Sequence, residues 1–359
     1  MTRPADGFPS GLSDRDRDVL RRVVQTFIDT AAPVGSRVVA ETVELSSASV
    51  RTTMQRLEVA GYLGHPHTSA GRVPTEQGYR LYVDGLMDVA GLSDREAGLL
   101  RESVRRRLGD LDAVATETSR LLGSLARLLG VVLTPRLATG VLERIEVIPL
   151  GAARVLFVLA LRGGLARTVA AEGDGDVRPG HFDAVVQRLN ERLAGHSLDE
   201  IRRTGAERVS DLADGDRTGI VRVVLRDAPT LFREPQGERR AAIAGTSHLV
   251  AQPEFQRPGA VRDVVELAEN EDVVIHLLEG AGAGDPDTPG ARVLIGRAVD
   301  RPDGSLGSGA DPATFSVVTA PYRVGGAAGA VAVIGPTRMD YARAVALVEH
   351  VAALLGEDG

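Results

Sequence analysis

Apolar residues in the first part of the chain recur every three or four positions, which is the spacing of one face of an α-helix. The first such run spans residues 19–28, and Ser13 precedes it as a candidate N-cap followed by aspartates in the first turn. Pro33 and Gly35 interrupt the pattern, so a second, short helix is expected to begin at Ser36. The pattern thus predicts two helices joined by a tight connection.

A third helix is expected from Ser46 or Ser47, which are suitable caps, to about Ala60, with Gly61 as its C-terminal stop. Its apolar side chains share one face of the helix. The opposite, polar face carries Arg51, Thr52, Gln55 and, at its edge, Arg56. Helix, short helix, turn and helix is the order of elements in a helix-turn-helix.

The polar face of the third helix has side chains that can read DNA bases. Arg pairs bidentately with guanine and Gln with adenine, and no acidic residue occurs between Ser46 and Arg56. A polar helix face is usually only solvated, but this one belongs to the second helix of a helix-turn-helix. We therefore expect this helix to contact DNA through Ser47, Arg51, Thr52, Gln55 and Arg56.

A hairpin is expected directly after the third helix. Residues 62–65 can form one strand, residues 66–71 a turn and residues 72–73 the return strand, after which Thr75 can cap a further helix. A hairpin in this position is a wing, although an ordinary surface hairpin would give the same pattern. Its hydroxyls, backbone N–H groups and charge suit phosphate oxygens or the minor groove. The candidate contacts are His67, Thr68, Ser69 and Arg72.

The remainder of the chain mixes helical and strand-like patterns. A long helical pattern covers residues 93–129, and its glycines indicate more than one segment. Later helices are expected at 261–268 and 339–355. Such a mixture suits an antiparallel sheet with helices on one side. The strand-like runs are 144–150, 154–161, 165–172, 272–279, 291–299, 314–324 and 328–336.

Composition narrows the possible chemistry. A chain of 359 residues, 43% of them hydrophobic, can form two or three domains. It contains no cysteine, which excludes disulfides, thiolate metal sites and cysteine nucleophiles. It also contains no lysine, so all 42 basic residues are arginines and lysine-dependent catalysis is excluded. The net charge of −7 disfavours nonspecific polyanion binding by the whole chain but leaves room for one local basic surface.

No membrane, metal or catalytic site is expected. No apolar run approaches the roughly 18 residues of a membrane helix, and the N-terminus lacks a signal peptide's apolar core, so we expect a cytoplasmic protein. The seven histidines are scattered, and only His65 and His67 lie close together. The glycines at 325–329 precede a strand rather than a helix, unlike a dinucleotide site. No cofactor is therefore predicted.

Several blocks of the chain resemble one known family. PVGSR at 33–37, SSASVRTTMQRLEVAGYL at 46–63 and PHTSAGRVPTEQGYRLYVD at 66–84 are closely similar to the bacterial heat-inducible transcription repressors, the HrcA repressors. The similarity returns in VLERIEVIPL at 141–150, in GTSHLVAQPEF at 245–255, and in SVVTAPY and VIGPTRMDYARAV within 316–345. No such block occurs between about Ala171 and Arg240.

The resemblance implies a multidomain α+β protein. It places a winged helix-turn-helix at residues 10–88, linker helices and the first part of a GAF-like α/β domain at 93–173, an inserted dimerisation segment at 174–255, and the second part of the GAF-like domain at 256–359. It implies repression of heat-shock chaperone operons through a homodimer on an inverted-repeat operator in double-stranded DNA. It also implies that a GroE-type chaperonin assists folding.

Two other functions remain compatible with parts of the sequence. One is a repressor whose GAF-like domain binds a metabolite, because apolar pocket linings look like core. The other is an enzyme with an appended DNA-binding head, as in bifunctional biotin ligases. The missing lysines and the missing phosphate-binding loop count against the enzyme.

Overall fold

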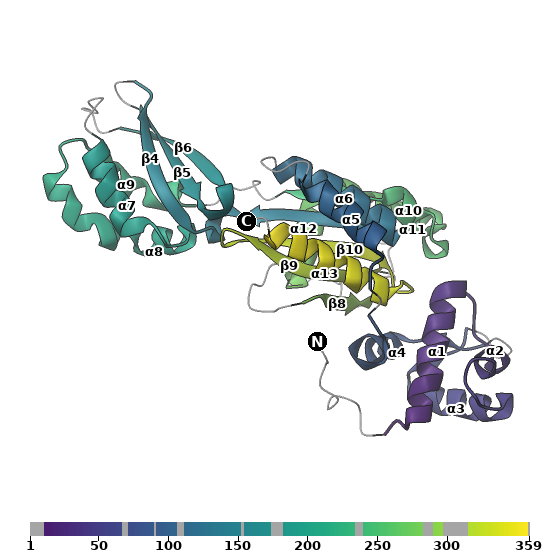
Figure 1. Ribbon diagram of the computed structural model, residues 1–359. Coiled ribbons are helices and arrows are strands. Elements are labelled where there is room, and N and C mark those ends of the chain that lie inside the picture. Colours follow the sequence, from purple (N-terminus) through teal and green to yellow (C-terminus); the bar gives the residue numbers. More distant parts are fainter. Residues whose placement is uncertain are drawn as a thin grey trace.

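Four helices and a short hairpin form an N-terminal unit at one end of the molecule (Figure 1). This computed structural model describes residues 11–66, 71–89, 91–105, 111–151, 154–173, 182–233, 240–282, 290–296 and 315–357. The unit contains α1 (Asp14–Thr30), α2 (Ser36–Ala40), α3 (Ser47–Val59), β1 (Leu63–Gly64), β2 (Val73–Pro74) and α4 (Glu76–Leu81), which continues as a π-helical turn over Tyr82–Leu86. The helices and the two hairpin strands lie where the sequence predicts them.

Local side-chain chemistry explains the ends of these helices. Ser13 and Asp16 form a reciprocal capping box at the start of α1, and the Ser46 hydroxyl accepts from the Ser49 amide at 3.2 Å at the start of α3. Gly61 follows α3 with a φ of 83°, a conformation that favours glycine. At Gly71 the reason for glycine is close approach, because a Cβ atom there would lie 2.6 Å from the backbone of Val34.

Two helices connect the N-terminal unit to a central sheet. The helical pattern of residues 93–129 resolves into α5 (Asp94–Arg105) and α6 (Leu111–Ala126). The chain then enters β3 (Leu129–Arg136), a strand that the sequence analysis did not predict. All but the last of its residues are buried. A strand that is buried on both faces shows no alternation of apolar and polar residues, so nothing in the pattern marked where the preceding helix ends and this strand begins.

The central sheet is antiparallel, with strand order β7-β3-β10-β9-β8. Its other strands are β7 (Ala241–Ala244), β8 (Arg292–Ile295), β9 (Phe315–Val324) and β10 (Ala327–Pro336). Every residue of β10 is buried. Helices cover both faces of the sheet: α5, α6 and α13 (Tyr341–Glu357) pack on one, and α10 (Thr246–Val250), α11 (Pro258–Glu269) and α12 (Glu271–Gly280) on the other.

Two predictions about this part of the chain were wrong. Helices do not lie on one side of the sheet alone, because alternate residues of its strands belong to two separate cores. Residues 272–279, predicted as a strand, form most of α12. The Asn270 side chain caps that helix by accepting from the Val273 amide at 3.3 Å. A short apolar run does not by itself distinguish a strand from a buried helix, because its conformation depends on what packs against it.

A smaller unit is inserted between β3 and β7 and lies at the opposite end of the central sheet from the N-terminal unit (Figure 1). It has a three-stranded sheet of β4 (Leu142–Pro149), β5 (Arg154–Leu161) and β6 (Ala166–Glu172), packed against α7 (Asp183–Leu193), α8 (Leu198–Val209) and α9 (Ile220–Leu231).

The predicted inserted segment, 174–255, overlaps this unit without coinciding with it. The boundary at 174 falls between β6 and α7, inside the unit. At the other end, Leu249 and Phe255 belong to the core beneath the central sheet. Whether the unit makes a dimer contact stays a prediction.

Candidate nucleic-acid interface

Helix α3 presents one face to solvent on which most of the side chains are polar, and this face is called the stripe. Its buried side is formed by Val50, Thr53, Met54 and Leu57. The exposed side carries all five residues predicted from this helix, namely Ser47, Arg51, Thr52, Gln55 and Arg56. The structure therefore brings the predicted α3 residues together on a single accessible face.

Arg51 and Gln55 are the two long polar side chains of this stripe with free donors. Neither is bound to another of the described residues. Ser47 Oγ lies 3.1 Å from Ser36 Oγ, and the Thr52 hydroxyl donates to the Ala48 carbonyl at 3.1 Å. Arg51 and Gln55 follow each other at helical i, i+4 spacing, so their donors are available to one external surface.

Arg56 has a different environment from Arg51. Its guanidinium forms an ion pair with Asp16 of α1, whose side chain is nearly buried. Burial alone would raise the pKa of the Asp16 carboxyl, but hydrogen bonds from Ser13 and Arg56 outweigh it and lower that pKa. Arg56 thus fastens α3 to α1 as well as lying at the edge of the stripe.

The hairpin is held against the end of α3 by Glu58. The Arg72 guanidinium lies 2.6 Å from Glu58 Oε2, and the His65 imidazole contacts the other oxygen of the same carboxylate. Arg72 also joins the chain after α1 to the hairpin, through paired backbone hydrogen bonds with Val34 at 2.8 and 2.9 Å. The sequence analysis placed Arg72 in the hairpin but did not foresee its partner on α3. His67, Thr68 and Ser69 lie outside the described residues.

Thr75 fixes the return of the hairpin to α4. Its hydroxyl donates to the Gly61 carbonyl at 2.6 Å and accepts from the Gly78 amide at 3.1 Å. Gly78 itself packs so closely that an added Cβ would lie 2.2 Å from the Tyr62 carbonyl oxygen. The turn between α3 and α4 is therefore tightly specified.

Arg37 was not among the predicted site residues. It lies exposed on α2, and none of the described residues forms an ion pair with it. The first helix of a helix-turn-helix crosses the DNA backbone, which makes an exposed arginine there a candidate phosphate contact. The signal was present in PVGSR at 33–37, where Arg37 is the only charged residue.

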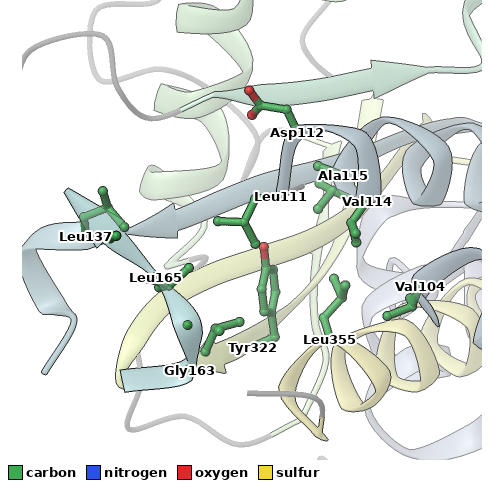
Figure 2. A pocket seen from close by; sticks show the side chains of 14 residues that line it. Val104, Leu111, Asp112, Val114, Ala115, Leu137, Gly163, Leu165, Tyr322 and Leu355 are labelled. Carbon is green, nitrogen blue, oxygen red and sulfur yellow. The ribbon is translucent and has the colours of Figure 1, made fainter. Parts of the chain in front are cut away.

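A cavity of about 730 Å³ lies at the other end of the central sheet, where α5 and α6 meet the turn between β5 and β6. Figure 2 shows Tyr322 among the apolar side chains that line it, with Leu111, Leu165 and Leu355 nearby. The Tyr322 hydroxyl donates to the Leu133 carbonyl at 2.9 Å. Asp112 is the one acidic side chain of the lining.

Two further kinds of feature, a candidate metal-binding cluster and a candidate membrane-spanning helix, are absent from the described part of the chain. Within it, no three His, Asp or Glu residues cluster in a way that could hold a metal ion. No described helix is long and apolar enough to cross a membrane.

Comparison with known proteins decides the family. Residues 112–345 match the family described as HrcA protein C terminal domain. The heat-inducible transcription repressor HrcA of Prosthecochloris aestuarii (strain DSM 271 / SK 413) is 38% identical over 348 residues, covering 95% of this chain and 96% of that protein. The HrcA of Chlorobium phaeobacteroides (strain BS1) is 38% identical over 346 residues, with 95% and 96% coverage. The chain belongs to the HrcA family.

Membership of the HrcA family confirms the resemblance and with it the function of a transcription repressor rather than an enzyme. An enzyme with an appended DNA-binding head is thereby excluded. A crystal structure of a hypothetical protein has the same fold, with a TM-score of 0.58 and 22% identity over 97% of this chain and 98% of that one. A mixed helix-and-sheet fold with several units therefore extends through the whole chain.

Proposed function

We propose that this HrcA-family repressor is a winged helix-turn-helix protein that binds an inverted-repeat operator in double-stranded DNA as a homodimer. The observation that carries the proposal is the exposed polar face of α3, the second helix of the proposed helix-turn-helix, on which Arg51 and Gln55 are unengaged within the described residues. Helices in this position enter the major groove of B-DNA. The stripe supplies the side chains that suit guanine and adenine edges.

The remaining predicted residues have supporting roles in this proposal. Ser47 and Thr52 lie beside the base-reading pair, and Arg37 lies where it can meet a phosphate. Arg56 keeps α3 on α1 and contributes charge at the edge of the stripe. Arg72 lies in the hairpin, and in this proposal it contacts the DNA backbone or the minor groove, together with His67, Thr68 and Ser69 as expected from the sequence.

The inserted unit has a surface suited to a second copy of the chain. On β4–β6, the side chains that point away from α7–α9 include an apolar row in which Ile148 pairs with Leu156 and Leu156 with Ala170. Ile148 is 44% exposed. Burial of this outer face between two copies would remove apolar area from water and favour association. The central domain is GAF-like in this proposal, and its sheet between two helical layers supports that assignment.

Selection from a random DNA pool tests the operator, with full-length protein and sequencing of the bound fraction. The expected result is enrichment of two inverted half-sites at one separation. Arg51→Ala and Gln55→Ala should each lose preference at one position of each half-site. Enrichment of no sequence, or of single half-sites alone, would contradict the proposal.

Sedimentation tests the dimer surface separately. Ile148→Asp with Leu156→Asp should shift the protein toward monomer, because two charges would be desolvated at the contact. Glu191→Ala, on the exposed side of α7, is the matched control and should leave the dimer intact. A dimer unaffected by the paired aspartates would place the contact elsewhere.

The cavity near Tyr322 favours a second candidate function, in which a small apolar metabolite regulates the same repressor. The cavity volume lies within the range of small-molecule sites. A thermal-shift screen of metabolites against wild type and Ala115→Trp, which fills the cavity, tests it. A ligand that stabilises only the wild type would support metabolite control.

A further inference from the structure

Helix α1 of the N-terminal unit ends without a positive charge of its own. Its last turn contains no basic residue and includes the exposed Asp29. The last four carbonyls of a helix lack helical partners and carry the negative end of the helix dipole. A cation at this end stabilises a helix, and the nearby sequence of α1 does not supply one.

Arg338 supplies it from the far end of the chain. This residue lies in the turn between β10 and α13, and its NH1 donates to the Ile28 carbonyl of α1 at 2.5 Å. The two residues are 310 positions apart in sequence. The contact therefore joins the N-terminal unit to the central domain.

The central domain holds the Arg338 guanidinium in a fixed orientation. Its Nε lies 2.7 Å from Glu254 Oε1, and its NH2 lies 3.4 Å from Glu254 Oε2 and 3.2 Å from Gln252 Oε1. The side chain is 12% exposed. Because each nitrogen of the planar fork has an acceptor, Arg338 has little freedom to follow α1 if α1 moves.

An aromatic contact lies beside this polar one. Tyr79 of α4 is almost fully buried, and its ring lies 5.9 Å from the ring of Tyr341, the first residue of α13. The Tyr341 hydroxyl donates to the Thr337 carbonyl at 2.6 Å and lies 3.0 Å from Ser316 Oγ. Both contacts thus come from the start of α13 and the turn before it, and together they fix two helices of the N-terminal unit.

We propose that Arg338 is a positioning residue for operator binding: it holds the N-terminal unit at one orientation on the central domain. This inference rests on the proposed homodimer on an inverted repeat. In such a dimer, the orientation of each N-terminal unit sets the separation of the two α3 helices. A dimer of this class matches half-sites about one helical turn, roughly 34–36 Å, or a multiple apart. Without the contact, the two units would tolerate several separations and lose part of the affinity that linkage provides.

A distance measurement tests the orientation without DNA. The chain has no cysteine, so spin labels at Asp18→Cys in α1 and Glu269→Cys in α11 are unique. Labelled full-length protein diluted with unlabelled protein reports the distance within one chain by pulsed electron resonance. We expect one narrow distance distribution in the otherwise wild-type protein and a broad one with Arg338→Met. Equally narrow distributions would overturn the proposal.

Operator spacing tests the consequence for function. Synthetic operators with identical half-sites and separations changed one base pair at a time are titrated with full-length protein. For the wild type we expect a sharp optimum in half-site separation. For Arg338→Met we expect a flatter optimum, with affinity at the optimum lower by about tenfold. That loss is a part of the roughly 10²–10⁴-fold gain in affinity that linkage of two sites can give. Affinity for a single half-site should not change.

Controls separate the possible failures. Arg120→Ala removes an exposed arginine of α6 whose ion-pair partner among the described residues is the neighbouring Glu117, and it should behave as wild type. Arg338→Lys keeps the charge without the fork and should fall between wild type and Arg338→Met. If Arg338→Met does not fold, Glu254→Gln weakens the same contact and takes its place. An unchanged spacing optimum, or tighter operator binding by Arg338→Met, would overturn the positioning role. A wild type without any spacing preference would instead contradict the proposed dimer on an inverted repeat.

Discussion

The Arg72 guanidinium of the hairpin lies 2.6 Å from the carboxylate of Glu58, in the last turn of α3. An arginine expected to meet DNA is thus already paired with an acidic side chain of α3, the helix proposed to read the operator. The same carboxylate contacts His65 on the other side of the hairpin. Glu58 therefore sets the position of the hairpin relative to α3 and reduces the positive charge there.

Arg72→Ala should lower affinity for all DNA sequences and reduce the salt dependence of binding by about one phosphate contact. Glu58→Gln should raise affinity for all DNA sequences and increase the salt dependence, because it removes a negative charge near the DNA phosphates and frees Arg72 from its ion pair. Fluorescence anisotropy titrations with labelled DNA, at several salt concentrations between about 50 and 200 mM, would give the affinity and its salt dependence for each variant. A slope that Arg72→Ala leaves unchanged would mean that Arg72 serves only to hold the hairpin on α3.

Arg51→Ala and Gln55→Ala should each cost about 1–3 kcal/mol of operator binding and relax the preference at a single base pair. Both side chains are exposed and unengaged within the described residues, so the change should not affect folding. Arg37→Ala is the matched comparison, because loss of a phosphate contact should weaken binding to all DNA sequences by the same factor. Base-substituted operators titrated against each variant separate the two behaviours. Equal weakening on every operator by Arg51→Ala would show that Arg51 contacts phosphate.

The junction of α5 with α13 should be sensitive to acid. Hydrogen bonds from the Ser93 hydroxyl, from Arg343 and from the Ser93 amide lower the pKa of the Glu96 carboxyl from 4.5 to about 2. A lowered pKa means that the charged carboxylate stabilises the folded state. The contribution is fully present above about pH 4.5 and is lost as the pH falls through about 2. Glu96→Gln should therefore lower the urea midpoint at pH 7 and make little difference near pH 2.

Arg343→Met checks the cause of that effect. If the ion pair of Arg343 with Glu96 is responsible, the double variant should be no less stable than the worse single variant, since neighbouring substitutions that remove one interaction are not additive. Full additivity at pH 7 would assign the effect to the Ser93 hydrogen bonds instead.

Mild heating should abolish operator binding, and a GroE-type chaperonin with ATP should restore it without any small ligand. A switch through the folding equilibrium itself needs no bound metal, no thiol and no small ligand. One or two kcal/mol is a large fraction of a typical domain's stability, which lets modest heating change the active fraction several-fold.

Gel-shift titration of heat-treated protein, with and without chaperonin, measures this switch. Binding that survives heating well above growth temperature would rule out folding as the sensor. Binding that returns only with an added metabolite would favour the cavity near Tyr322 as the regulatory site.

The N-terminal unit was predictable because its signals are local. Ser13 and Ser46 cap helices within three residues of themselves, and Gly61 ends one by its own backbone preference. The α3 stripe followed from the same helical period. The family resemblance added the operator and the domain plan, which spacing alone does not contain.

The errors and omissions arose where the information is not local. Strand β3 and helix α12 are both short apolar runs whose conformation depends on what packs against them. Glu58 lies on α3 and Arg72 on the returning side of the hairpin, and Arg338 and Ile28 are separated by almost the whole chain. Pairings of this kind leave no period or spacing in the sequence, so only the folded chain shows them.

The side chain of Asn190 on α7 binds the free edge of β4, accepting from the Ile145 amide at 2.6 Å and donating to the Ile145 carbonyl at 3.0 Å. An open strand edge is a template for pairing with other chains, and aggregation often begins there. A repressor that loses activity by partial unfolding is exposed to that hazard each time the temperature rises. With Asn190 bound at this edge, an inserted unit that stays folded during heating should pair less readily with other chains. Reversibility, rather than rigidity, would then be the property that Asn190 protects.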